Sequence, residues 1–308
     1  MDDPINFTYD GTIDLESMTA STNPSPQPKY PRLVAFSLRY MDVHGYIAVV
    51  VCFWGVIANV ANIVVLTRKN MTSCTNLILT WLAVADLLTM LSCLPINIHF
   101  YIMKDPTLPF PSTRSSTWIR IMLFHVNFSV VCHTIAIWLT IMLAIFRFLY
   151  ICYPSRGSQL CSMFRTKIGI AVIYVATAAI CIPNYLVNAI KNTPYQGNGT
   201  GGNKTEYYFA FAQSDISEPL LQKINFWIQA LLIKLIPCLL LTILTIFLIY
   251  AMHDAHKRRM RLKSQGRKDE SERAHEHNRT TAMLLAVVGL FLLTELPQGV
   301  LTLCSIFI

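Results

Sequence analysis

Three ionisable residues, Asp86, Lys234 and Glu295, lie inside long apolar stretches of the sequence. A charge at the centre of a membrane helix costs about 2.5–3.5 kcal/mol on insertion scales, so such residues usually face the interior of a helix bundle and have a partner. In one interpretation Lys234 and Glu295 form an internal ion pair; in the other, Glu295 faces the cation of a ligand. Both alternatives stay open, because a ligand can also displace the lysine.

The residues around Glu295 favour a polar cavity. Gln298 follows on the same face of a helix, and Pro297 kinks the helix by freeing a backbone carbonyl. The sequence has no nucleophile elbow, P-loop or His-Glu-x-x-His motif, so we predict that the protein is not an enzyme. We also predict no cofactor and no metal site, since the loop histidines lack the spacing of zinc ligands.

The apolar stretches themselves predict the fold class. Of the 308 residues, 54% are hydrophobic and 14% are charged, whereas a soluble domain has roughly 25% charged residues. This composition excludes a soluble enzyme and a nucleic-acid-binding domain. We predict an all-α, polytopic helix bundle that crosses the lipid bilayer, because six stretches have about the 20 residues that a membrane helix needs. The predicted helices cover about 45–67, 76–102, 117–151, 166–190, 222–253 and 276–307.

The ends of the chain differ in character. Residues 1–43 are polar and rich in Asp, Ser and Pro, and we predict a disordered extracellular segment there. Residues 44–308 form the predicted membrane domain. The sequence is still apolar at Ile308, so we predict that the chain is truncated before a further helix.

Basic residues predict the orientation in the membrane. Lys and Arg gather in the loops after the first, third and fifth predicted helices, and such loops are normally cytoplasmic. The N-terminus and the loops after the second and fourth helices are then extracellular, in the plasma membrane. Sequons on that side predict glycosylation of Asn6, Asn198 and Asn203.

Several motifs together resemble rhodopsin-like (class A) G-protein-coupled receptors, of which the chain would hold six of the seven membrane helices. The motifs are Asn59, Leu82-Ala83-Val84-Ala85-Asp86, Phe146-Arg147-Phe148 before Tyr153-Pro154, Pro237, and Phe291 followed by Pro297. Within the family, Cys132–Thr140 and Thr294–Gly299 resemble invertebrate myosuppressin and FMRFamide-type neuropeptide receptors.

The resemblance implies roles for individual residues. Arg147 matches the arginine that restrains the sixth helix at rest and meets the G protein when the receptor is active. Asp86 matches the sodium-site aspartate, although Ala136 replaces the serine of that site and argues against sodium binding. The residues of the packing triad that relays activation are Ile137, Pro237 and Phe291.

The sequence also departs from the family pattern at other places. Phe146 stands where an acid normally precedes the arginine, and the tryptophan of the fourth helix is absent, with Ile173 or Tyr174 nearby. The outer end of the third helix and the outer loop 191–223 both lack the cysteines of the usual disulfide.

These observations predict a receptor for a short amidated peptide of the RFamide or myosuppressin type, which signals through a heterotrimeric G protein. The candidate ligand-binding residues are Glu295, Gln298, Lys234, Gln229, His133, Ser129 and His99. Two alternatives are a truncated, non-signalling isoform or dimerisation partner, and a six-span channel or transporter. The channel alternative predicts a pore-lining polar face or an internal repeat, and the sequence has neither.

Overall fold

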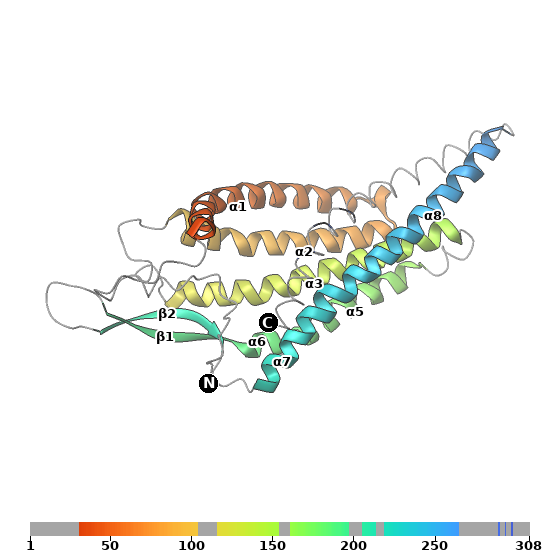
Figure 1. Ribbon diagram of the computed structural model, residues 1–308. Helices are drawn as coiled ribbons and strands as arrows, with labels where there is room; N and C mark the ends of the chain where they lie inside the picture. Colours follow the sequence, from red (N-terminus) through yellow and green to blue (C-terminus); the bar gives the residue numbers. More distant parts are fainter. Residues whose placement is uncertain are drawn as a thin grey trace.

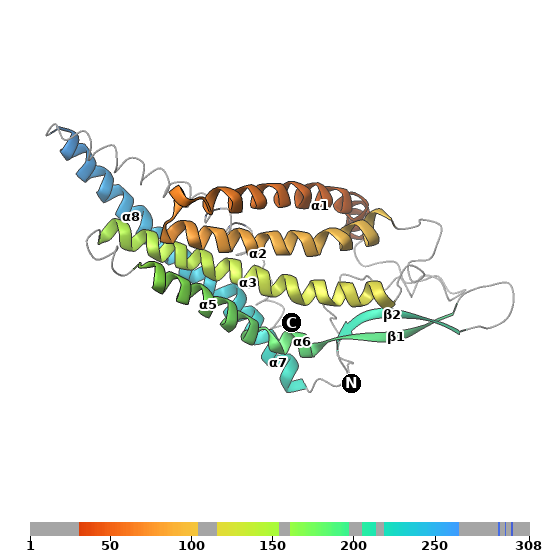
Figure 2. The ribbon, with the colours of Figure 1, turned by 180° about the vertical axis from the view of Figure 1, so that it is seen from behind.

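The computed structural model describes residues 31–103, 116–153, 161–196, 205–213 and 219–264, together with Gly289, Leu293 and Pro297. In this part of the chain, long helices lie side by side and a two-stranded hairpin projects from one end (Figures 1 and 2). Five of the helical stretches are long and apolar enough to cross a membrane: Val43–Leu66, Cys74–Ile102, Ser116–Cys152, Met163–Val187 and Leu220–Asp254. They confirm the prediction of a polytopic helix bundle, whereas the predicted sixth helix, 276–307, falls almost wholly outside the described residues.

The first three long helices form the straight part of the bundle. They are α1 (Pro31–Leu66), α2 (Cys74–Asn97) and α3 (Ser116–Cys152). A short 3-10 turn, η2 (Lys69–Met71), joins α1 to α2, and a π-helical turn, η3 (Ile98–Ile102), continues α2. α2 packs between α1 and α3, so that it is the central helix of this layer (Figure 1).

The remaining helices are interrupted. α5 (Met163–Ile180) is followed by the short α6 (Ile182–Val187), and α7 (Pro219–Trp227) leads through the π-helix η5 (Ile228–Leu235) into α8 (Ile236–Ser264). α8 packs on α3 and crosses it obliquely (Figures 1 and 2). The break at Cys181 coincides with Pro183 in the first turn of α6. A proline is tolerated there, because the backbone N–H groups of a first turn have no partner within the helix.

Hydroxyl side chains start two of these helices. Ser73 accepts a hydrogen bond from the backbone N–H of Asn76 at 3.1 Å, and Ser162 accepts one from that of Arg165 at 3.4 Å. Each serine satisfies one of the backbone donors that the first turn of a helix leaves unpaired. The starts of α2 and α5 are therefore encoded locally, at Ser73 and Ser162.

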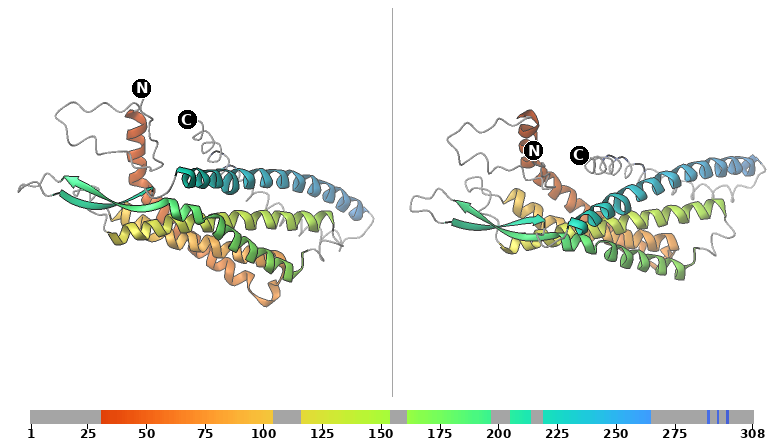
Figure 3. Two further views of the ribbon diagram at one scale, coloured as in Figure 1. Left: turned by 90° about the horizontal axis from the view of Figure 1, so that it is seen from below. Right: turned by 60° about the horizontal axis from the view of Figure 1, so that its bottom comes forward.

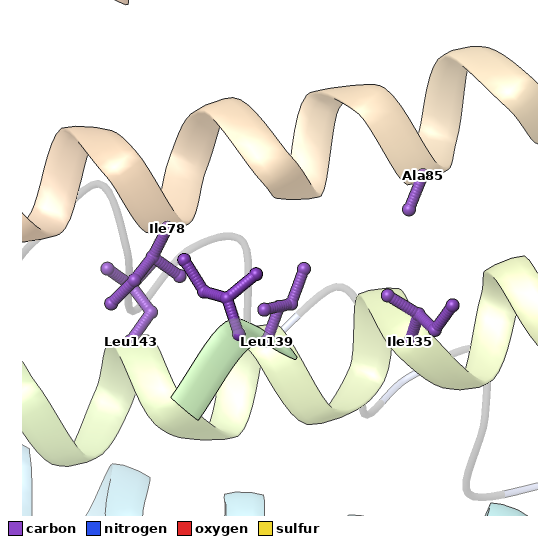
Figure 4. Packing of buried hydrophobic residues seen from close by; sticks show 6 residues of the cluster. Ile78, Ala85, Ile135, Leu139 and Leu143 are labelled. Carbon is purple, nitrogen blue, oxygen red and sulfur yellow. The ribbon is translucent and has the colours of Figure 1, made fainter. Parts of the chain in front are cut away.

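A core of aliphatic side chains joins α2, α3 and α5. Ile135, Leu139 and Leu143 follow one another at the four-residue spacing of a single helix face and meet Ile78 and Ala85 of α2 (Figure 4). Ile170 of α5 completes the cluster. Many large apolar side chains point away from the bundle instead, such as Trp54 at 64% and Val175 at 71% exposure, and the lipid of a membrane is the environment that suits them.

Two boundaries differ from the sequence prediction. α1 begins at Pro31, so residues 31–43, which we predicted to be disordered, are helical, and the first turns of α1 bend away from the rest of the helix (Figure 3). The fourth membrane helix ends at Val187 rather than at 190, because the chain enters strand β1 (Asn188–Gln196).

The hairpin was not predicted from the sequence. β1 pairs antiparallel with β2 (Thr205–Gln213), in a register that places Asn188 opposite Gln213 and Gln196 opposite Thr205. A signal was present in the sequence. The aromatic residues Tyr207, Phe209 and Phe211 recur at every second position, which is the period of a strand. Both strands contact α3, so the hairpin lies against one end of the bundle.

Candidate functional site

Four amide side chains form a hydrogen-bonded network where the hairpin joins the bundle, and we call them the amide network: Asn127, Asn184, Asn188 and Gln229. The Asn127 Oδ1 atom accepts from Asn184 Nδ2 at 2.9 Å and from Asn188 Nδ2 at 2.8 Å, and Asn184 Oδ1 accepts from Gln229 Nε2 at 2.7 Å. The network therefore connects α3, α6, β1 and η5. Asn127 and Asn184 are buried, with 3% and 4% exposure, and buried amides are stable only when they are paired in this way.

Gln229 and Lys234 both lie in the π-helix η5. Gln229 is half-buried and belongs to the amide network. Lys234 is also half-buried, while Glu295 and Gln298 lie outside the described residues, so the proposed pairing with Glu295 stays a prediction. π-Helical segments are rare and frequent at functional sites, and this one holds two of the candidate ligand-binding residues.

The other candidate ligand-binding residues occupy separate places. His99 of η3 stacks on Trp118 at the start of α3, with ring centroids 3.7 Å apart and planes 6° apart. Ser129 donates to the carbonyl of Val126 within α3 at 3.1 Å. His133 lies one turn further along α3 and is exposed. His99 therefore lies on η3, and Ser129 and His133 lie on α3, whereas Gln229 lies on η5.

Asp86 lies on α2 opposite α3, within range of an electrostatic attraction to His133. Asp86 is half-buried. Asn59, which is also one of the family motif residues, donates to the carbonyl of Gly55 in its own helix at 2.9 Å.

Arg147 lies at the opposite end of the bundle from the hairpin. It is close to Tyr150, whose hydroxyl is within hydrogen-bonding reach of Cys74. The Cys74 thiol donates to the carbonyl of Cys161 at 2.7 Å. Burial raises the pKa of the Cys161 thiol, and the neighbouring Cys74 raises it further. Phe146, which replaces the usual acid, packs against the aliphatic core.

The packing triad is described in part. Ile137 of α3 is 2% exposed and packs with Ile141 and with Leu241 of α8. Pro237 is fully buried and precedes Leu241 by about one turn of α8. Phe291 lies outside the described residues, as do the predicted glycosylation sites Asn6, Asn198 and Asn203.

Sequence reasoning missed the asparagines of the amide network. Asn127, Asn184 and Asn188 carry no charge, so they did not stand out among the costly residues of the apolar stretches. An uncharged amide in a membrane helix is nevertheless a signal, because it needs a hydrogen-bonding partner there. Among the described residues, no group of three or more His, Cys, Asp or Glu side chains is arranged to hold a metal ion.

Comparison with known proteins identifies the class of protein as a G-protein-coupled receptor. Residues 46–308 match the family described as serpentine type 7TM GPCR chemoreceptor Srw, and the chain belongs to this family. The family consists of receptors rather than enzymes, which confirms the prediction that the chain is not an enzyme, and it gives no support to a channel or transporter.

Similar receptors come from a nematode and a fly. The chain is 28% identical to the G-protein coupled receptor dmsr-1 of Caenorhabditis elegans, over 86% of the chain and 59% of that receptor. It is 29% identical to the sex peptide receptor of Drosophila melanogaster, over 85% of the chain and 60% of that receptor. For the FMRFamide receptor of Drosophila melanogaster, the identity is 24% over 83% of the chain and 44% of the receptor. The chain therefore matches at most about 60% of the length of these receptors.

Proposed function

We propose that the chain is the membrane domain of a neuropeptide receptor, with the N-terminus and the hairpin outside the cell in the plasma membrane. A short amidated peptide of the RFamide or myosuppressin type binds at the hairpin end, and a heterotrimeric G protein binds at the other end. The observation that carries the proposal is the family match over residues 46–308. Relatives named for peptides, the sex peptide receptor and the FMRFamide receptor, support the ligand class.

The distribution of basic residues supports this orientation. Arg68 and Lys69 lie between α1 and α2, and Arg165 lies in the first turn of α5. The bond from Cys74 to Cys161 places these two connections at one end of the bundle, away from the hairpin, and α8 extends beyond the bundle at the same end (Figure 1). Because Lys and Arg gather on cytoplasmic loops, this end is the cytoplasmic one.

The candidate ligand-binding groups suit a peptide with a cationic side chain. Gln229 and Lys234 lie in η5, which begins close to the hairpin, and Glu295 supplies a carboxylate on the sixth helix predicted from the sequence. A guanidinium binds a carboxylate through paired, charge-assisted hydrogen bonds, which are strong in a site of low dielectric constant. Glu295 is therefore the proposed partner of the arginine in a C-terminal Arg-Phe-amide, and peptide binding favours an outward position of the sixth helix.

The test combines a receptor variant with a peptide variant, in a receptor that contains this chain. Glu295→Gln should weaken an Arg-Phe-amide peptide by about tenfold or more, since a charged hydrogen bond is lost. It should leave unchanged the affinity for the same peptide with citrulline in place of arginine. Asp254→Asn, at the basic end, is the matched control and should bind both peptides as the unaltered receptor does. Equal losses for both peptides, or no loss for either, would exclude Glu295 as the partner of the arginine.

A further inference from the structure

The hairpin is attached to the bundle without a covalent crosslink. The sequence has no cysteine between Cys181 and Cys238, so no disulfide can start from the hairpin, which runs from Asn188 to Gln213. The first residue of β1, Asn188, instead donates to Asn127 Oδ1 in α3 at 2.8 Å. This hydrogen bond lies at the base of the hairpin, where the chain leaves the bundle.

Asn127 has a distinct role among the four amides, because one oxygen atom accepts two donors from different elements. Asn184 of α6 and Asn188 of β1 both donate to Asn127 Oδ1. The oxygen is buried with its side chain, which is 3% exposed. If β1 moved away from α3, the Asn188 amide would lose its acceptor on Asn127, and a polar group that loses its hydrogen-bonding partner inside a protein is costly.

The second bond of Asn184 extends the network to the candidate ligand-binding residues. Asn184 donates to Asn127 and accepts from Gln229 Nε2 at 2.7 Å. Asn127 therefore determines the position of Asn184, and Asn184 determines which way the Gln229 amide points. A change at Asn127 reaches η5 through two hydrogen bonds.

We propose that Asn127 is a positioning residue, which anchors the hairpin to α3 and, through Asn184, orients Gln229. The part that concerns Gln229 rests on the proposed function, in which Gln229 contacts the peptide. The anchoring of the hairpin does not depend on any ligand, so it can be tested without peptide.

The test measures backbone hydrogen exchange in the full 308-residue chain, reconstituted in lipid nanodiscs without peptide. Asn127→Leu keeps the branched shape of the side chain and removes its acceptor. It should speed exchange at the amides of 188–196 and 205–213 by about tenfold, the factor that corresponds to one lost buried hydrogen bond. Exchange in the middle of α2 and α3 should stay at the level of the unaltered chain, which a general loss of stability would not allow.

Asn97→Leu provides the matched control. Asn97 is also buried, with 4% exposure, but it donates to the carbonyl of Cys93 and to the Cys93 sulfur within its own helix. Its replacement should leave the exchange of the hairpin unchanged. If Asn97→Leu loosened the hairpin as much as Asn127→Leu does, the anchoring role of Asn127 would be disproved.

A second variant keeps the proposal testable if Asn127→Leu does not fold. Asn188 is only half-buried, so Asn188→Leu should be tolerated and should give the same faster exchange across the hairpin. The double variant should exchange no faster than Asn127→Leu alone, because both changes break the same bond. Hairpin exchange at the unaltered rate in Asn188→Leu would overturn the proposal.

Discussion

The hydroxyl of Tyr174 in α5 donates a hydrogen bond to the backbone carbonyl of Trp81 in α2, over 3.0 Å. The two rings also meet edge to face, with centroids 5.5 Å apart and planes 75° apart. Tyr174 packs on the aliphatic core, while Trp81 is 41% exposed on the outer surface of the bundle. This pair therefore extends the contact between α2 and α5 from the core to the lipid-facing surface.

Removing the Tyr174 hydroxyl should weaken this contact without disturbing the rings. Tyr174→Phe should lower the free energy of unfolding by about 0.6 kcal/mol, and by no more than about 1.5 kcal/mol, the range for such bonds in membrane proteins. Unfolding of the purified protein in increasing SDS measures the change. Tyr250→Phe is the control, because Tyr250 is 71% exposed, and an equal loss there would show that the bond to Trp81 is not the cause.

The close approach of α1 to η3 depends on Gly45. A methyl group on Gly45 would collide with the Cβ atom of Tyr101, which cannot move independently of the backbone, whereas one on Gly55 would meet only the flexible end of Met90 at 3.3 Å. Gly45→Ala should therefore destabilise the protein by about 1–3 kcal/mol, the usual cost of overpacking, and Gly55→Ala by much less. Thermal unfolding of the two variants compares them. Similar losses would mean that α1 does not pack closely against Tyr101.

The aliphatic core contains Leu139, which has no exposed surface (Figure 4). Leu139→Ala should cost about 2–5 kcal/mol in the free energy of unfolding, because it leaves a cavity between α2 and α3. The same change at Leu239, which is 54% exposed, removes side-chain contacts mainly with lipid and should cost far less. A small effect at both positions would contradict the packing of α2 against α3 described above.

The Cys161 thiol should titrate at unusually high pH in the folded protein. Burial and the nearby Cys74 raise its pKa, so it holds its proton to higher pH than in the unfolded chain. The stability that comes from keeping the Cys161 thiol protonated is present below the pKa of the unfolded chain, and it is lost as the pH rises through the pKa of the folded protein. The rate of alkylation at Cys161, followed by mass spectrometry from pH 7 to 11, should have a higher midpoint in nanodiscs than in SDS. Equal midpoints would refute the prediction.

The sequence allowed the membrane helices to be predicted because each is encoded by its own run of apolar residues. The predicted range 76–102 coincides closely with Cys74–Ile102, for example, since no tertiary information is needed to recognise an apolar stretch. The partners of polar residues depend on helix rotation, which the apolar runs do not determine. Gln229 was selected from the sequence as a candidate ligand-binding residue, but its bond to Asn184 joins positions far apart in the chain. The hairpin was missed for a similar reason. Its two strands pair with each other and contact α3, so their stability depends on residues that are far apart in the sequence.

The central claim is that the receptor responds to an amidated peptide, and nucleotide exchange on a heterotrimeric G protein tests it most directly. Membranes containing the receptor are exposed to short peptides that end in Arg-Phe-amide and to the same peptides with a free carboxylate. We expect exchange with the amidated peptides and a response at least about tenfold weaker with the acids, since a buried carboxylate without a partner is costly. Equal responses to both forms, or no response to any amidated peptide, would contradict the claim.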